Sequence, residues 1–252
     1  MIRLRTALLL AAASAGLSAG LAACAYNEAL GRNQFLIVDN GSMVQQSNAA
    51  WQEALRTQNA TTSGAQVERI RGIGNRLVRT AGLGDRTWDY AVFTNASPNA
   101  FVLPSGQIGV TTGLLNLVQN DDQLASVIGH EIGHVVANHA AERSSSRAMT
   151  SIGLSALQGV AGDYGDAVGA YGGLAAQYGV LLPYSRRDEL EADRLGVDYV
   201  QSAGWRPSQS VALWRLMAAQ RQTSTPQFAS THPSDATRID ALEQYIASRG
   251  WN

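Results

Sequence analysis

The strongest restriction on the fold comes from the segment VIGHEIGHVVANH, Val127 to His139, which holds three of the four histidines of this 252-residue chain. Just upstream, Asn120 followed three residues later by Gln123 is typical of a helix start. Apolar residues then follow the helical period, at Leu124, Val127, Ile128, Val135 and Val136. The sequence therefore predicts that the clustered histidines lie on one helix.

Within this segment, His130 to His134 has the pattern H-E-x-x-H. Side chains four residues apart share a helix face, so two imidazoles reach one tetrahedral zinc ion. Glu131 is then placed to take a proton from the attacking water as general base. A chance match in this composition has an expectation on the order of 0.002. The alternative, a structural zinc site, is disfavoured because such sites usually add Cys or His ligands, and the chain has no cysteine to spare.

A catalytic zinc needs a third protein ligand and an open position. His139 follows His134 by five residues, whereas the metzincin pattern requires Gly at 137 and His at 140, where this chain has Ala137 and Ala140. That class is excluded. We interpret His139 as a helix-end residue near terminal carbonyls.

The segment DELEADRLG offers a better third ligand. On a helix, Glu189 and Asp193 share one face while Glu191 points elsewhere. One carboxylate can ligate zinc as the other accepts an imidazole N–H. The alternative is a solvated, salt-bridged face formed with the arginines at 186, 187 and 194. The upstream H-E-x-x-H pattern favours the metal site.

The remaining patterns place these motifs in a mainly helical α+β chain. Residues 65–82 have helical spacing that ends at Gly82, and WDYAVFT and AFVLPSGQIGVTTGLL read as strands, the second broken by a turn at Leu103 to Gly106. Two further helices are predicted over 186–204 and 208–220. We expect a small sheet packed beside the histidine helix.

At the N-terminus, Arg3 and Arg5 precede an apolar run that ends at Ala23, the layout of a secretory signal. The residues LAAC, ending at Cys24, resemble the bacterial lipobox, and this single cysteine has no disulfide partner. An ordinary signal peptide or a start-anchor helix remains an alternative. We expect a signal peptide at 1–23, a lipidated tether at 24–34 and a zinc metallopeptidase domain at 35–252. By resemblance to bacterial lipoproteins, in which an aspartate after the cysteine favours inner-membrane retention, Ala25 implies an outer-membrane lipoprotein facing the periplasm.

Composition removes one class of partner. The chain is 45% apolar, so it can bury a sizeable core, and its net charge is −1. No basic cluster exceeds Arg186-Arg187, which argues against nucleic acid as a partner.

Several segments together resemble metallopeptidase family 48, the gluzincins that include HtpX, the CAAX prenyl protease and BepA-type periplasmic proteases. They are NAFVLPSGQIGVTTGLL, HEIGH, ELEADRLG and THPSDATRI, and the likeness runs from about Phe35 to Arg238. The resemblance implies a gluzincin-type fold. It also implies one Zn²⁺ held by His130, His134 and Glu189, with Asp193 supporting a ligand.

The resemblance further implies a zinc-dependent endopeptidase that hydrolyses misfolded or misassembled envelope proteins. Its expected partners are unfolded proteins, the membrane through a lipid on Cys24, and outer-membrane assembly machinery. The alternative is an outer-membrane protein assembly chaperone whose zinc site is mostly latent. A zinc hydrolase for cell-wall fragments is a weaker third reading.

Two further expectations concern the surroundings of the zinc. The strand Gln107, Ile108, Gly109, Val110 and Thr111 is expected to accept an extended substrate as an additional strand. His232 is a candidate for oxyanion stabilisation or for occupying the open position, against the alternative of a loop residue fixed by the following proline. Arg238 and Tyr184 are weaker candidates for the same role.

Overall fold

The computed structural model of the chain describes residues 24–160, 182–220, 232 and 236–251, so the expected signal peptide at 1–23 lies outside the described residues. The first half holds the strands and two helices: β1 (Cys24–Asn27), β2 (Arg32–Phe35), α2 (Asn40–Thr57), β3 (Ala60–Thr61), α3 (Ala65–Thr80), β4 (Asp89–Phe93), β5 (Ala100–Leu103) and β6 (Gln107–Thr111). Helices follow: α4 (Thr112–Leu117), α5 (Asp121–Val136), α6 (His139–Val160), α8 (Leu182–Ser202), α9 (Ser208–Gln220) and α11 (Ala236–Ser248). The mainly helical α+β fold is confirmed.

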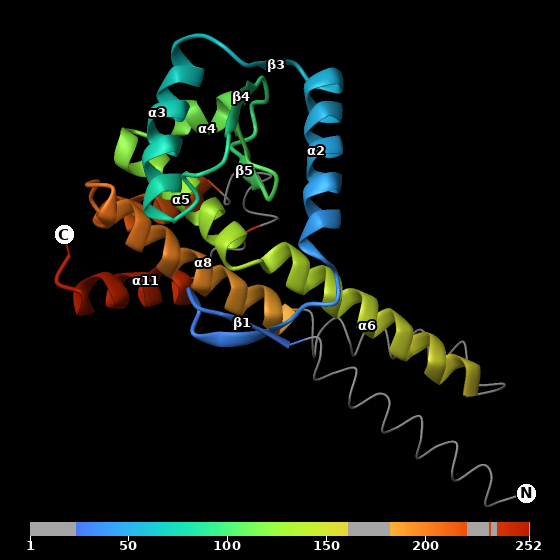
Figure 1. Cartoon of the computed structure of the whole chain (residues 1–252). Helices are drawn as coiled ribbons and strands as arrows, with labels where there is room; N and C mark the ends of the chain where they lie inside the picture. The colour runs from blue at the N-terminus through green and yellow to red at the C-terminus, as the bar shows by residue number, and fades with distance from the viewer. Residues whose placement is uncertain (1–23, 161–181, 221–231, 233–235, 252) are drawn as a thin grey trace, which may run out of the picture.

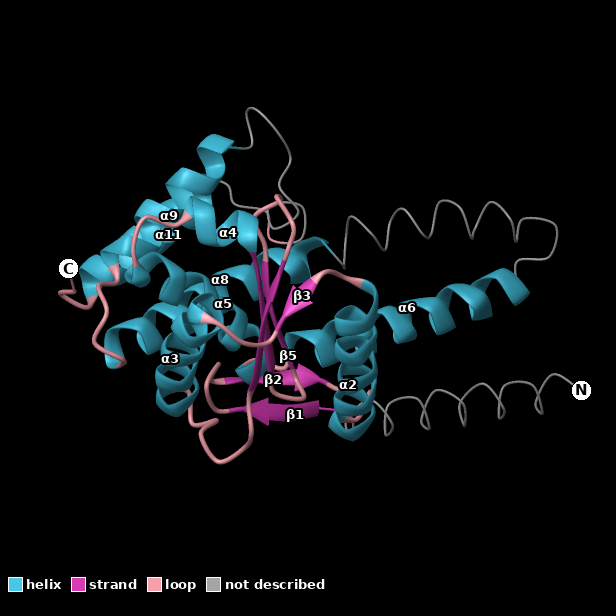
Figure 2. Ribbon diagram, turned by 90° about the horizontal axis from the view of Figure 1, so that it is seen from above, coloured by secondary structure: helices cyan, strands magenta, loops and turns pink. Residues whose placement is uncertain are grey.

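A four-stranded sheet in the order β3-β4-β6-β5 lies beside the central helix α5, as predicted. Strands β4 and β6 are parallel, and the two outer pairings are antiparallel. Figure 2 shows the sheet between α2 on one side and α3 and α5 on the other. On the α2 side, Trp51 packs edge-on against Phe93 with ring centroids 5.8 Å apart. The opposite face joins the main core, where Ile70 and Ile108 are fully buried.

Local signals explain where the elements begin and end. The Asn120 side chain caps α5 by accepting a hydrogen bond from the Gln123 amide at 3.0 Å. Helix α3 ends just before Gly82, whose φ of 70° suits a helix C-terminus, and the predicted turn places Gly106 at φ 98°. The segment after β6 forms α4 rather than strand, because the Thr111 side chain caps a new helix.

Helices α5 and α8 pack side by side at the centre of the molecule (Figure 1). Their backbones approach closely because glycines face each other. A Cβ built on Gly196 would lie 2.7 Å from the backbone nitrogen of His130, and one on Gly133 would lie 2.9 Å from the Ala192 carbonyl oxygen. This contact brings the two predicted metal-binding motifs together.

Strands β1 and β2 form a hairpin that packs against the C-terminal end of α5. Asn27 Nδ2 donates to the Val136 carbonyl at 3.1 Å, and Gln34 Nε2 donates to the Ala137 carbonyl at 2.6 Å. Residues 24–34, expected as a tether, are thus largely paired and docked, because their side chains satisfy carbonyls that a helix end leaves free. Lipidation of Cys24 stays a prediction.

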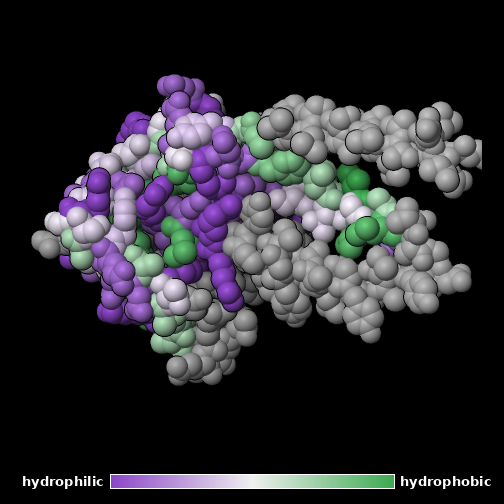
Figure 3. Space-filling view, turned by 90° about the horizontal axis from the view of Figure 1, so that it is seen from below, coloured by the Kyte–Doolittle hydropathy of each residue, from purple (hydrophilic) through white to green (hydrophobic). Residues whose placement is uncertain are grey.

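Helix α6 projects from this body (Figure 1). Figure 3 shows apolar side chains on this projection, whereas the body on the same view is mostly hydrophilic; the exposed residues include Met149, Ile152 and Leu157. In the parts of the chain that the structure describes, no helix combines the length and apolar character needed to cross a bilayer.

Candidate metal centre and active site

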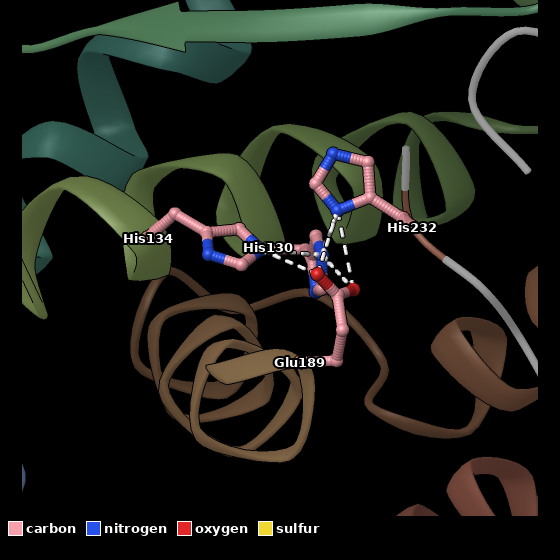
Figure 4. Close-up of side chains that lie close together, drawn as sticks. All are labelled: His130, His134, Glu189 and His232. Carbon is pink, nitrogen blue, oxygen red and sulfur yellow. Dashed lines mark hydrogen bonds and ion pairs between the residues drawn. The ribbon is translucent and has the colours of Figure 1, made fainter. Parts of the chain in front are cut away.

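The structure brings the three predicted zinc ligands together. His130 and His134 project from α5 with their Nε2 atoms 3.2 Å apart. Glu189 reaches them from α8, with Oε2 3.4 Å from His130 Nε2 and Oε1 3.3 Å from His134 Nε2 (Figure 4). The three side chains are almost completely buried. The i, i+4 spacing of the histidines therefore produces the geometry that the sequence indicated.

A fourth donor comes from a distant part of the chain. His232 Nδ1 lies 3.1 Å from both Glu189 oxygens and 3.3 Å from His130 Nε2 (Figure 4). The four donor atoms all lie within 4.8 Å of one another. His232 Nε2 also lies 3.3 Å from Glu131 Oε1. His232 thus occupies the place of a fourth ligand.

The donor set fits a zinc ion. His130 Nδ1 lies 2.9 Å from Asp193 Oδ1, so this nitrogen carries the proton and Nε2 presents its lone pair. His134 Nδ1 lies 2.8 Å from His139 Nδ1, which leaves His134 Nε2 with its lone pair if His134 is the donor. Two imidazole lone pairs and a carboxylate facing each other repel unless a cation lies between them. Nitrogen and carboxylate donors of this kind suit zinc.

The pKa values of the two histidines in the motif shift in opposite directions. Burial lowers the pKa of His130, but hydrogen bonds with Asp193 and Glu189 outweigh it and raise that pKa to about 9. Burial holds the pKa of His134 well below its usual range. Glu189 is buried too, yet hydrogen bonds from the surrounding histidines keep its pKa well below the ordinary value. Without an ion, a proton on His130 therefore takes the place of the cation between this imidazole and the Glu189 carboxylate.

Glu131, the candidate general base, lies at the wall of a cavity. This cavity of about 390 Å³ is also lined by His134, His232 and Val102 of β5. Burial raises the pKa of the Glu131 carboxyl. A molecule bound in this cavity would contact both the carboxylate and the metal-binding face.

Arg238 and Tyr184 were the weaker candidates for the role of His232, and the structure describes the side chain of Arg238 alone of the two. Arg238 is buried, and its Nε and Nη2 each donate to Asp193 at 2.8 Å while Nη1 lies 2.9 Å from Glu189 Oε2. Its contacts hold the two carboxylates, and it does not line the cavity beside Glu131. The Tyr184 side chain lies outside the described residues, so its role stays a prediction.

The strand expected to dock substrate was assigned wrongly. Gln107, Ile108, Gly109, Val110 and Thr111 form β6, which lies between β4 and β5 and is buried throughout. Its backbone groups are already paired on both sides, so it cannot accept another strand.

Among the described strands, β5 is the edge nearest the site. The Thr111 amide donates to the Asn99 carbonyl at 3.0 Å. Because hydrogen-bonded and non-hydrogen-bonded pairs alternate in an antiparallel ladder, the peptide groups of Ala100 and Val102 point to the outer edge. Val102 also lines the cavity that holds Glu131.

Sequence reasoning missed the support behind His134. His139, interpreted as a helix-end residue, is fully buried at the start of α6, and its Nε2 lies 3.0 Å from Glu191 Oε2. Asn138 adopts φ 51° and so interrupts the helix between α5 and α6. This change of chain direction places the His139 ring beside the His134 ring. Glu191 does face away from Glu189, as expected, but toward His139. The five-residue spacing was the available signal, once a helix break between the two histidines is recognised.

A buried H-E-x-x-H helix joined by a glutamate from a second helix defines a gluzincin-type metallopeptidase site. Residues 65–246 match the profile of Peptidase family M48, and the chain belongs to this family. The predicted family is confirmed.

Named relatives agree with this assignment. The mitochondrial metalloendopeptidase OMA1 of Schizosaccharomyces pombe is 36% identical over 174 residues, covering 68% of this chain and 50% of that protein. Metalloendopeptidase OMA1 of Bos taurus is 31% identical over 211 residues, covering 78% and 40%. The beta-barrel assembly-enhancing protease of Yersinia pestis is 29% identical over 178 residues, covering 68% and 37%. The chain spans half or less of the length of these relatives.

Proposed function

We propose that this chain is a zinc-dependent endopeptidase. The observation that carries the proposal is Glu131 facing a cavity beside the converging donors of His130, His134 and Glu189. A zinc ion bound by these three residues would supply a Lewis acid that polarises a peptide carbonyl and makes water more acidic.

The side chains around this site have distinct tasks. Glu131 accepts a proton from the attacking water and passes it to the leaving amine. Its buried position raises the pKa of the carboxyl group, which makes the carboxylate a stronger base than that of an exposed glutamate. Asp193 and His139 hold the ring nitrogens that face away from the metal position, and so fix the orientation of the two imidazoles.

An extended peptide fits the outer edge of β5. The peptide groups of Ala100 and Val102 point outward and can pair with a substrate backbone, as in strand addition. Val102 lies at the wall of the cavity that holds Glu131, so a peptide on this edge would pass the general base.

His232 closes the site in the form described here. Its Nδ1 adds a fourth protein donor to the cluster. A zinc ion with four protein ligands lacks the open position that catalysis requires. We propose that this arrangement is a resting state and that His232 is displaced when substrate enters.

The cellular role is proposed from the N-terminus and one relative. The lipobox-like segment before Cys24 supports an outer-membrane lipoprotein facing the periplasm, with misfolded or misassembled envelope proteins as substrates. The similarity to a protein named a beta-barrel assembly-enhancing protease supports contact with assembly machinery of that membrane. The closed site favours one alternative, a chaperone that binds such proteins and rarely cuts them.

Zinc content and casein cleavage of the full chain test the catalytic proposal. Glu131→Gln should retain zinc and lose cleavage by about 10² to 10⁴-fold, the usual contribution of a positioned acid–base group. The matched control is Glu53→Gln, since Glu53 is exposed on α2 and forms an ion pair with Arg56, away from the metal centre. A metal-free wild-type protein, or a Glu131→Gln variant with wild-type activity, would contradict the proposal.

Complementation of a deletion strain separates the protease from the chaperone. If hydrolysis carries the function, Glu131→Gln does not restore the wild-type phenotype. Rescue by this variant at equal protein level would assign the function to binding.

A further inference from the structure

Arg32 joins the N-terminal hairpin to the acidic groups behind the metal centre. It begins β2 and lies upstream of the segment that matches the family profile, residues 65–246. Its guanidinium makes two hydrogen bonds to Glu191, from Nε and Nη2, both at 2.7 Å. Two more go to Glu142, from Nη1 and Nη2, both at 2.9 Å. One side chain thus forms paired contacts with two carboxylates from α6 and α8.

The surroundings make this cation costly to remove. The Glu142 and Glu191 side chains are only 2% and 16% exposed, and Arg32 is 20% exposed. Arg187 also contacts both acids, but it is 37% exposed, with one contact at 3.1 Å and one at 3.7 Å. Two partly buried carboxylates repel each other unless a well-placed cation lies between them, and planar guanidinium groups suit such paired contacts.

From Glu191 the hydrogen bonds continue to the ring of the metal-binding residue His134. Glu191 Oε2 lies 3.0 Å from His139 Nε2, and His139 Nδ1 lies 2.8 Å from His134 Nδ1. His139 Nε2–H donates a hydrogen bond to the Glu191 carboxylate, so His139 Nδ1 carries no proton and accepts a hydrogen bond from His134 Nδ1–H. His134 Nε2 then presents its lone pair toward Glu189 and the metal position.

We propose that Arg32 is a positioning residue for the metal centre, acting through Glu191 and His139 on the orientation of His134. This inference rests on the proposed zinc-dependent function. The hairpin β1–β2 therefore contributes to the metal centre through Arg32, although it lies outside the segment that matches the family profile. Loss of Arg32 frees Glu191 to turn toward solvent, and His139 then no longer holds His134 in the ligating orientation.

Zinc affinity measured by chelator competition on the full chain is the direct test. Arg32→Ala should weaken zinc binding by about tenfold, within the range of 10 to 100-fold for groups that support metal ligands. The visible spectrum of the cobalt-substituted protein should shift as well, since the ligand field at the metal changes. Arg56→Ala is the matched control, because Arg56 pairs with Glu53 on the exposed face of α2. This control should keep wild-type affinity and spectrum.

A double-variant cycle separates action through Glu191 from a general loss of stability. Arg32→Ala should weaken zinc binding no further in a Glu191→Gln background. Full additivity, or wild-type affinity of Arg32→Ala, overturns the inference and leaves the peptidase proposal intact. A wild-type protein that binds no zinc overturns the proposed function itself. If Arg32→Ala does not fold, Arg32→Gln, which keeps most of the side-chain stem, decides by the same measurements.

Discussion

His134 and His139 share a hydrogen bond of 2.8 Å between their Nδ1 atoms. A residue five positions beyond the H-E-x-x-H pattern therefore fixes the ring of the second histidine of that pattern. The break at Asn138 makes this contact, because a continuous helix would place position 139 on a different face.

This contact predicts that His139→Ala weakens zinc binding by about 10 to 100-fold. In His139→Asn, the amide oxygen lies close to the position of Nδ1 and can still accept a hydrogen bond from His134 Nδ1–H. The asparagine variant should therefore keep most of the affinity. Chelator competition measures both, and equal loss in the two variants would show that the ring packing, rather than the hydrogen bond, matters.

The position of His232 predicts the direction of its effect. Since His232 Nδ1 supplies the fourth donor, His232→Ala should open a coordination position and increase casein cleavage at saturating zinc. The same variant should bind zinc more weakly because one ligand is lost. Unchanged cleavage at equal zinc content would remove the regulatory role.

Substrate pairing with β5 predicts a backbone effect at Val102. Val102→Pro removes an outward N–H without breaking a hydrogen bond between β5 and β6. The variant should raise KM several-fold, because the substrate backbone loses one hydrogen bond. Its zinc affinity should be unchanged. Val102→Ala keeps the N–H and serves as the control for the lost side chain. An equal rise of KM in both variants would place the effect in the side chain.

The glycine contact between α5 and α8 predicts a strong local effect on stability. Gly196→Ala would place a Cβ 2.7 Å from the His130 nitrogen, so it should lower the free energy of unfolding. Overpacking of this kind costs about 1–3 kcal/mol. Gly72→Ala on α3 meets nothing within 4 Å and should instead stabilise the protein by about 0.5–1 kcal/mol. Urea denaturation measures both, and a Gly196→Ala variant as stable as the wild type would contradict the close contact.

The Arg32 network predicts the acid sensitivity of the fold. Burial raises the pKa of Glu191, but hydrogen bonds with Arg32 and His139 outweigh it and lower that pKa from 4.5 to about 2. A carboxyl group with a lowered folded-state pKa contributes stability that is complete above its unfolded pKa. That contribution is lost as the pH falls from about 4.5 toward about 2.

Glu191→Gln should therefore flatten the decline of the unfolding free energy in this pH window. Urea denaturation at a series of pH values between 6 and 2 measures the slope, with Glu53→Gln as an exposed control. A wild-type slope in Glu191→Gln would mean that other carboxylates carry the acid response.

Short-range signals predicted much of this site. The Asn120 cap, the helical period and the i, i+4 spacing of His130 and His134 are local properties, and the structure reproduces each of them. The shared face of Glu189 and Asp193 was equally readable, since it follows from helix geometry alone. Resemblance to a known family supplied the link between the two helices.

Long-range relationships were not readable in the same way. The order β3-β4-β6-β5 depends on a parallel pairing between β4 and β6, and no local pattern distinguishes this order from one with β6 at the edge. The expected substrate strand was misplaced for this reason. Arg32 contacts Glu191 across 159 positions in the sequence, and a single arginine in a polar segment carries no sign of such a partner.

Strand β1 begins at Cys24, the residue that we expect to be acylated, and its first residue already pairs with Phe35. If Cys24 carries acyl chains, no flexible linker would separate the bilayer from the folded domain. The domain would then be held at a fixed height and tilt above the membrane. It could act only on polypeptides that come to the membrane surface.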